Sequence, residues 1–293
     1  MEQIFGECHA HLFMDGIDYR AAKARHFAGV DEENLRLQLR EYQKRGITFV
    51  RDGGDACNVS RRAKELAEEY GIDYRSPIFA IHLEHRYGSI VGFPFSNMKE
   101  YHARVLQAKK AGADFIKIMT TGILDFHHFG VITGTPLREE TVREMVHIAH
   151  EEGFAVMSHT NGIQGVQAAL AAGVDSLEHG NYMDDETIRM LSRSGTVWVP
   201  TVSTVYNLLG DGRFPEEEVQ KIAAHVAANV RRAYELGACV APGSDAGAYR
   251  VLHGQGIMDE VETIAGILGD RPETERWLKA GENRIQERFK RRG

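Results

Sequence analysis

The sequence has little cysteine and no long uninterrupted apolar run. Only three of its 293 residues are cysteines, and Cys8, Cys57 and Cys239 are scattered and odd in number. This usage does not fit a disulfide framework and is typical of reduced thiols in a cytosol. The chain also lacks an apolar stretch of membrane-spanning length and an apolar leader at its start. We therefore expect a cytoplasmic protein with no membrane partner.

The sequence also lacks an excess of basic residues. It has 35 lysines and arginines against 42 aspartates and glutamates, a formal net charge of -7. Surfaces that bind nucleic acid need clustered lysine and arginine, so we expect no nucleic-acid partner. The basic ending, residues 288–292, is interpreted as a solvated tail.

Apolar runs alternate regularly with segments of helical pattern. Hydrophobic residues make up 43% of the chain, enough for a large core. After the first apolar run at residues 4–7, which leads into His9 and His11, strands are predicted at residues 47–52, 76–82, 114–119, 154–159, 174–179, 196–200 and 238–245. Helices are predicted at residues 31–45, 59–70, 98–111, 138–152, 163–172, 184–194, 216–236 and 258–268.

This alternation favours one closed barrel. Strands joined by crossover helices must be parallel, and eight of them close on themselves, so the sequence predicts a single α/β domain over residues 1–293, a (β/α)8 TIM barrel. An open doubly wound sheet is the alternative. It would need Gly-x-Gly-x-x-Gly after the first strand, where this chain has histidines.

Metal-binding side chains stand at the predicted strand ends. His9 and His11 are two residues apart and point to the same face of a strand. Two imidazoles do not hold a divalent metal alone, because such ions take four or more ligands. The remaining candidates follow later strands, and the loops after barrel strands share one face. These candidates are Lys117, His159, His179 and Asp245.

Lys117 is the unusual member of this set. A protonated amine among cations inside a barrel is costly, so the side chain could instead reach outward or pair with a carboxylate. The alternative is that burial lowers the pKa of the amine, which then reacts with carbon dioxide. The resulting carbamate has two oxygens and could bridge two divalent ions.

The motifs together resemble the amidohydrolase superfamily, above all its prolidase-like and imidazolonepropionase-related metal-dependent hydrolases. They are His9-Ala10-His11, residues 46–54, 114–119, 158–159, 177–180 and 243–247. The resemblance implies that His9 and His11 bind the more buried ion and that His159 and His179 bind the more exposed one. It also implies that carboxylated Lys117 bridges them and that Asp245 contacts the buried ion and handles protons.

The chain departs from this resemblance in two places. Relatives usually carry a small β-sandwich built from segments before and after the barrel, and here the first ligand is already residue 9. We therefore expect a barrel that lacks this sandwich. The loop at residues 120–129 does not match the glycine-rich stretch expected after the lysine strand, so specificity need not follow the relatives.

The expected reaction is hydrolysis of a C–N bond in a small amide or cyclic amide, such as an N-acyl amino acid or dipeptide. Two divalent ions, with zinc expected, would generate a bridging hydroxide, with Asp245 as the proton shuttle. Tyr206 could donate to an oxyanion, or simply pack in its loop. Arg86 could hold a substrate carboxylate, or lie on the surface. The other candidates for substrate binding are His85, Tyr87, His128 and His253.

Other functions use the same ligand pattern. A lactonase or phosphotriesterase-like esterase would attack with the same hydroxide. A mononuclear deaminase fits less well, because it does not need the strand-four lysine. A non-catalytic binding or assembly protein would be expected to have lost its ligands. The sequence leaves the substrate and any homo-oligomeric state open.

Overall fold

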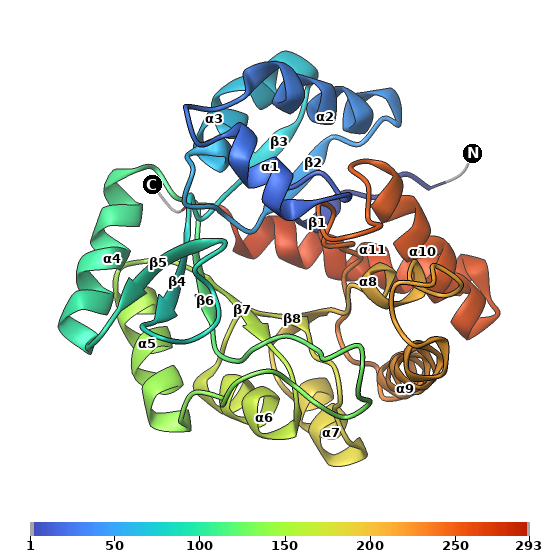
Figure 1. Ribbon diagram of the computed structural model, residues 1–293. Coiled ribbons are helices and arrows are strands. Elements are labelled where there is room, and N and C mark those ends of the chain that lie inside the picture. The colour runs from blue at the N-terminus through green and yellow to red at the C-terminus, as the bar shows by residue number, and fades with distance from the viewer. Residues whose placement is uncertain (1–2, 292–293) are drawn as a thin grey trace.

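A computed structural model describes residues 3–291 of the chain. Parallel strands occupy its centre, and helices surround them (Figure 1). The strands are β1 (Glu7–Ala10), β2 (Phe49–Asp52), β3 (Asp73–Arg75), β4 (Ala80–Leu83), β5 (Gly92–Phe95), β6 (Ile116–Met119), β7 (Val156–Thr160), β8 (Ser176–His179) and β9 (Val197–Val199). The fold is thus of the α/β class, as predicted.

The strands form two hydrogen-bonded sheets. One has the order β1-β2-β3 and the other the order β5-β4-β6-β7-β8-β9, and every pair is parallel. In the longer sheet Lys117 is opposite Ala80, and Met119 is opposite His159. Because all strands run in the same direction, their carboxyl ends lie at one edge.

Residues 239–246 connect the two sheets, although the prediction of a regular strand at 238–245 is wrong. On one side the Cys239 carbonyl accepts from Trp198 N in β9 at 2.9 Å. On the other side the Pro242 carbonyl accepts from Cys8 N at 3.2 Å, and Asp245 N donates to the His9 carbonyl at 2.7 Å. Only isolated bridges form along this segment, since proline cannot donate to a ladder.

The predicted strand at 76–82 needs a similar correction. The chain forms β3, which pairs with β2, and β4, which pairs with β6. Pro77 lies between them and Ile78 has a left-handed φ of 68°, so the chain bends there. The first strand is also shifted, because β1 begins at Glu7 and Ile4 is exposed.

Each of the eight predicted helices has a counterpart. They are α2 (Glu32–Lys44), α3 (Val59–Leu66, extended by the 3-10 turn Ala67–Tyr70), α4 (Met98–Lys110), α5 (Glu139–Glu151), α6 (Ile163–Ala172), α7 (Asp185–Arg193), α9 (Glu216–Glu235) and α10 (Gln255–Leu268). Side-chain caps fix several starts, including Asp31 on α2 and Asn97 on α4. Residues 17–30, predicted from the sequence as a loop with helical turns, contain α1 (Tyr19–Arg25). The sequence did not predict β5, α8 (Ser203–Tyr206) or α11 (Arg271–Arg288).

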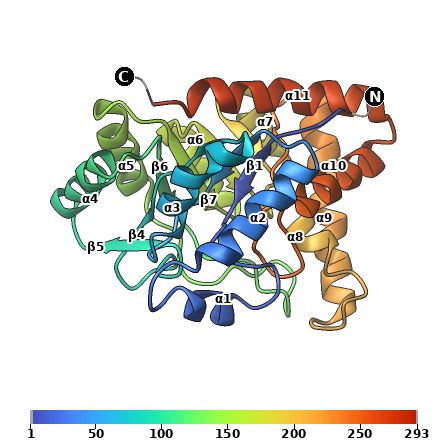
Figure 2. The ribbon, with the colours of Figure 1, turned by 90° about the horizontal axis from the view of Figure 1, so that it is seen from above.

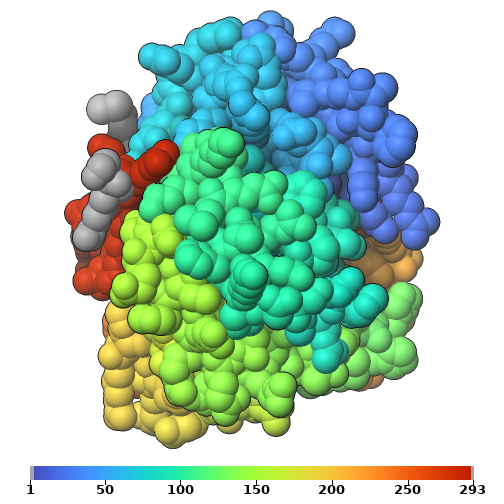
Figure 3. Space-filling view, turned by 90° about the vertical axis from the view of Figure 1, so that its left-hand side faces the viewer, coloured from blue at the N-terminus to red at the C-terminus, as the bar shows by residue number. Residues whose placement is uncertain are grey.

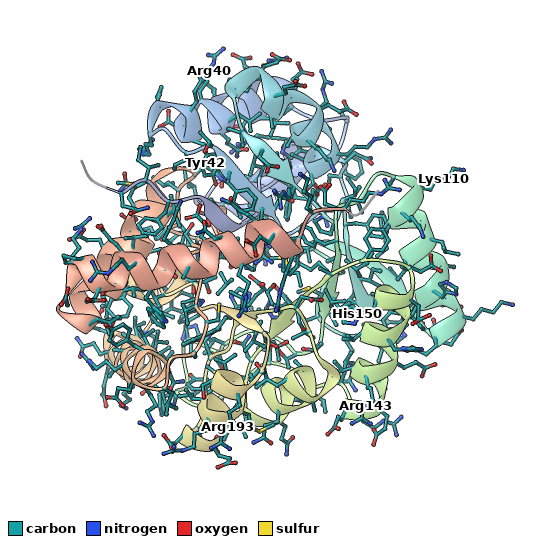
Figure 4. All side chains as sticks on the ribbon, turned by 180° about the vertical axis from the view of Figure 1, so that it is seen from behind. Arg40, Tyr42, Lys110, Arg143, His150 and Arg193 are labelled. Atoms are coloured by element: carbon teal, nitrogen blue, oxygen red, sulfur yellow. The ribbon has the colours of Figure 1, made fainter. Side chains whose placement is uncertain are left out.

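The prediction of a solvated tail at residues 288–292 is wrong for Phe289, whereas Lys290 and Arg291 are exposed and Arg292 lies outside the described residues. Helix α11 crosses the back of the molecule (Figure 4), and Figure 2 shows it along one side of the fold. Phe289 at its end is fully buried, with its ring 5.2 Å from that of Phe115. In the space-filling view this end of the chain lies beside segments from both halves of the sequence (Figure 3). In the sequence, the basic residues on either side of Phe289 masked its role as a buried apolar residue.

Among residues 3–291, no helix combines the length and apolar character that crossing a bilayer requires.

Candidate metal centre

The six predicted ligands gather at the carboxyl ends of the strands. His9 is in β1 and His11 follows it; Lys117, His159 and His179 are in β6, β7 and β8; Asp245 is in the segment that contacts β1. All except Asp245 are buried, and the Asp245 side chain keeps 17% of its exposure. The group is therefore accessible mainly through Asp245.

Distances show how closely these side chains approach. Lys117 Nζ lies 3.0 Å from His9 Nε2 and 3.5 Å from His11 Nε2. Asp245 Oδ1 lies 3.5 Å and 3.7 Å from the same two nitrogens. The His179 ring centroid lies 5.1 Å from that of His9 and 4.6 Å from that of His159. The four imidazoles thus form a continuous cluster.

Each imidazole uses one nitrogen to contact a group outside the set of six predicted ligands. Nδ1 of His9 contacts a carboxylate oxygen of Glu178 at 2.7 Å, and Nδ1 of His11 contacts the Gly54 carbonyl at 3.2 Å. His159 uses Nε2, which contacts the Gly122 carbonyl at 3.0 Å, whereas His179 uses Nδ1, which is 2.8 Å from Thr201 Oγ1. These contacts orient each ring and leave its other nitrogen for a ligand.

The donor set fits a metal ion. Ligand atoms of His9, His11 and Asp245 lie within 4.8 Å of one another. Asp245 Oδ1 is buried and has no hydrogen-bond partner within residues 3–291, a condition that folded proteins normally avoid. Imidazole and carboxylate ligands in this combination suit zinc and related divalent ions. His159 and His179, beside this trio, could hold a second ion.

Burial sets the protonation of the imidazoles. It lowers the pKa of His159 to about 3 and places the pKa values of His9, His11 and His179 well below the ordinary value. The Lys117 ammonium adds to the lowering in all four. The imidazoles are therefore neutral near pH 7, as metal ligands must be.

Lys117 and Asp245 shift in opposite directions. Burial lowers the pKa of Lys117, opposed by the nearby carboxylates of Glu178 and Asp245. Burial raises the pKa of Asp245, opposed by the Lys117 charge. Both shifts favour the uncharged forms, so the amine has more nucleophilic character than an exposed lysine.

Unusual backbone conformations accompany the ligands. His179 and Asp245 have φ values of 68° and 60°, a region that residues other than glycine seldom adopt. Successive strand residues face opposite sides, yet Glu178 and His179 both approach His9, which the turn at His179 permits. Gly53 is also required, because a Cβ there would lie 2.3 Å from the His11 ring.

The predicted substrate residues lie in several places. Tyr87 lies near the site, its ring centroid 5.1 Å from that of His159 and its plane tilted by 38°, and burial raises its pKa. His85, Arg86 and Tyr87 line a pocket of about 170 Å³ together with residues 122 and 133–135. His128 is exposed and pairs with Asp125 at 2.8 Å.

Two other candidates make contacts within the protein. The Tyr206 hydroxyl donates to the Ala223 carbonyl at 3.3 Å. His253 is buried, with Nδ1 3.0 Å from the Tyr42 hydroxyl and Nε2 2.8 Å from the Met14 carbonyl. Their contacts with substrate stay predictions.

Sequence analysis missed the residues that support the ligands. The most prominent are Glu178 and Arg51, both fully buried and paired at 2.9 Å. Arg51 precedes a predicted strand end, and Glu178 precedes a ligand. For Arg51 the available signal was a charged residue in the mostly apolar strand predicted at residues 47–52, whereas Glu178 gave no such signal.

Sequence comparison places the chain in a family. A sequence model described as the amidohydrolase family matches residues 5–269. This match covers most of the chain, which therefore belongs to the amidohydrolase family, as the motifs indicated. The family relationship supports hydrolase activity and dependence on metal.

Individual relatives match over shorter regions. An uncharacterised protein of Mycobacterium tuberculosis is 30% identical over 135 residues, 44% of this chain and 36% of that protein. Ochratoxinase of Aspergillus niger is 28% identical over 145 residues, 46% of this chain and 29% of the enzyme. The matched region thus spans about a third of the length of these curated relatives.

Solved structures match over almost the whole chain. A Xaa-Pro dipeptidase with methionine in its active site has a TM-score of 0.74 and 24% identity, covering 96% of this chain and 75% of the dipeptidase. The Aspergillus niger ochratoxinase structure has a TM-score of 0.75 and 20% identity, covering 93% and 68% of the two chains. At this identity the likeness supports the α/β fold.

Proposed function

We propose that the protein is a binuclear metal-dependent hydrolase that cleaves the C–N bond of a small amide or cyclic amide, such as an N-acyl amino acid or dipeptide. The observation that carries the proposal is the buried cluster of four imidazoles, each oriented by one nitrogen, around Lys117 and Asp245. A packed interior would not otherwise gather six such groups, because their desolvation is costly.

We further propose that the strands form a closed eight-stranded barrel. β3 and β4 would together form one bent strand of the barrel, and residues 239–246 would form the eighth strand. The bonds of this segment to β9 on one side and β1 on the other support closure. Closure would hold the ligands on a rigid ring of strand ends, which is where barrel enzymes build active sites.

The proposed centre would hold two divalent ions, with zinc expected. His9 and His11 would bind the buried ion and His159 and His179 the other, with a carbamate on Lys117 between them. Such ions, when bound, supply a hydroxide nucleophile near neutral pH and polarise the scissile carbonyl. The lowered pKa of Lys117 supports its carboxylation, because an uncharged amine is the form that reacts with carbon dioxide.

Asp245 would move the proton. Its raised pKa suits a group that takes a proton from the attacking water and delivers it to the leaving nitrogen. Its side chain is partly exposed, whereas His9 is completely buried, so Asp245 stands on the open side of the cluster. Substrate would therefore approach past Asp245.

The neighbouring pocket would bind the rest of the substrate. It is lined by Tyr87, whose ring lies beside that of His159, and by Arg86. Arg86 is exposed and lines this pocket, and a guanidinium there suits a substrate with a carboxylate. The name of the Xaa-Pro dipeptidase denotes action on a dipeptide, which carries such a carboxylate and supports the proposed substrate class.

Metal analysis and a substrate screen would test the proposal together. Protein supplied with zinc or manganese would be assayed for metal content and against N-acyl amino acids, dipeptides, lactones and cyclic ureas. We expect two ions per chain and cleavage of an amide. Hydrolysis of lactones alone would favour the esterase, and one ion per chain would favour the deaminase. A well-folded protein without metal or activity would refute the proposal.

A further inference from the structure

A buried ion-pair network lies behind the proposed metal centre. Glu178 has no exposure, and its carboxylate is 2.7 Å from Nδ1 of His9. Arg51, equally buried, donates to both Glu178 oxygens through Nη2, at 2.9 Å and 3.0 Å. Ser176 also donates its hydroxyl to Glu178. The carboxylate is thus surrounded by donors.

The geometry of Arg51 is fixed independently of Glu178. Its Nε donates to the Cys8 carbonyl at 2.7 Å, and its Nη1 donates to Ser176 Oγ at 2.8 Å. The Phe289 ring lies 4.4 Å from the guanidinium carbon, where a cation–π contact is favourable. Arg51 can therefore hold Glu178 in one place, because the Cys8 carbonyl, Ser176 and the Phe289 ring fix its guanidinium.

We propose that Glu178, held by Arg51, is the positioning residue of His9. Because Arg51 and Ser176 already donate to the two Glu178 oxygens, the carboxylate acts as an acceptor toward Nδ1 of His9, which places the proton on Nδ1 and leaves Nε2 as a lone pair. That nitrogen points toward Lys117 and Asp245, at 3.0 Å and 3.5 Å. This inference rests on the proposed function, since it assigns Nε2 of His9 to the metal.

Glu178 differs from the partners of the other three rings. His11 and His159 contact backbone carbonyls, and His179 contacts a threonine hydroxyl, which are all neutral groups. A hydrogen bond to a charged acceptor is stronger, and it raises the basicity of the coordinating nitrogen. His9 would therefore be the most firmly oriented imidazole of the four.

The test is Glu178→Gln, which keeps the shape but has one acceptor oxygen. If the amide oxygen faces Arg51, its NH2 faces Nδ1 and forces the proton onto Nε2; the reverse orientation sets NH2 against the donors of Arg51. We expect zinc affinity of the metal-free protein, measured by competition with a chelator, to fall about 10- to 100-fold. The electronic spectrum of the cobalt-loaded protein should also change.

Glu282→Gln is the matched control. Glu282 is also buried and paired, with Lys279 Nζ at 2.9 Å, but contacts none of the imidazoles. The Glu282→Gln substitution should lower thermal stability and leave zinc affinity unchanged. An equal loss of zinc affinity in both variants would show a general structural effect and overturn the assignment.

A second measurement uses the metal-free wild-type protein, so it does not depend on whether a variant folds. Nitrogen-15 NMR of the histidine side chains in the metal-free wild-type protein should show His9 protonated on Nδ1. Protonation on Nε2 would overturn the proposal, as would unchanged zinc affinity in Glu178→Gln. If the wild type binds no zinc, the proposed function fails, whereas the tautomer still decides the role of Glu178.

Discussion

The two ends of the central strands differ in the side chains they bring together. At the carboxyl ends, His9, Lys117 and Asp245 bring polar atoms together without satisfying all of them. At the opposite end, residues from several strands pack with α11 into a small apolar cluster: Cys8, Phe49, Phe115, Met157, Val197, Val199, Ala241, Ile285 and Phe289. We call these the mouth and the floor. The mouth keeps reactive groups available, and the floor supplies the packing that holds them.

The mouth should be far more sensitive in activity than in stability. Asp245→Asn preserves size and removes a base, so we expect the fold to persist while turnover falls roughly 10²- to 10⁴-fold. Turnover of an N-acyl amino acid and a thermal melt measure the two effects. Asp259→Asn, which alters a carboxylate bonded to Gln255 on α10, is the control. Near-normal turnover in Asp245→Asn would refute the proton-transfer role.

The floor should show the reverse pattern. Phe289→Ala removes a fully buried ring that contacts Phe115 and Arg51, so we expect a loss of about 3–5 kcal/mol in the free energy of unfolding. Zinc affinity should fall less than in Glu178→Gln, because the hydrogen bonds of Arg51 to the Cys8 carbonyl and to Ser176 remain. Phe27→Ala, at a position 92% exposed, should have almost no effect in the same denaturation experiment. Equal losses would show that α11 does not seal the floor.

Zinc should separate the two regions directly. At a hundred times its dissociation constant, a ligand specific to the folded state raises the free energy of unfolding by about 2.7 kcal/mol. We expect this gain in the wild type and in Phe289→Ala, measured by chemical denaturation with and without zinc. His9→Ala should lose most of it. A full gain in His9→Ala would mean that zinc binds elsewhere.

The sequence predicted the mouth better than the floor. The His9-x-His11 spacing and the strand-end positions of His159 and His179 identified side chains that the structure brings together. These positions depend on the alternation of side chains along a strand and on the common direction of the strands. Both can be inferred from local sequence pattern. The floor depends on where α11 returns to the fold, a long-range arrangement that local pattern does not encode.

The supporting residues were missed for a related reason. Glu178 looks like an ordinary polar residue beside a histidine, and only its burial and its contact with Arg51 distinguish it. The break between β3 and β4 could have been inferred from Pro77, because proline interrupts a hydrogen-bonded ladder. In contrast, the left-handed φ values of Ile78, His179 and Asp245 are imposed by tertiary structure and leave no signal in residue type.

The smallest expected difference between the regions is in pH dependence. Burial lowers the pKa of His159 from its ordinary value of 6.5 to about 3, so its neutral form stabilises the fold above pH 6.5. That contribution is lost as the pH falls toward 3, and between pH 4 and 6 one such group adds about 1.4 kcal/mol per pH unit. In metal-free protein, His159→Gln should therefore reduce the slope of the unfolding free energy against pH in this range. The reduction should correspond to about one fewer proton taken up on unfolding.

His128→Gln is the control for this measurement. His128 is exposed, and its hydrogen bond with Asp125 raises its pKa, so its contribution has the opposite sign: it is present at low pH and lost as the pH rises. Removing it should not flatten the slope between pH 4 and 6. Chemical denaturation at a series of pH values compares the two variants. An unchanged slope in His159→Gln would mean that this imidazole is not held neutral by burial, and the mouth would then share the tolerance to charge of the exposed surface.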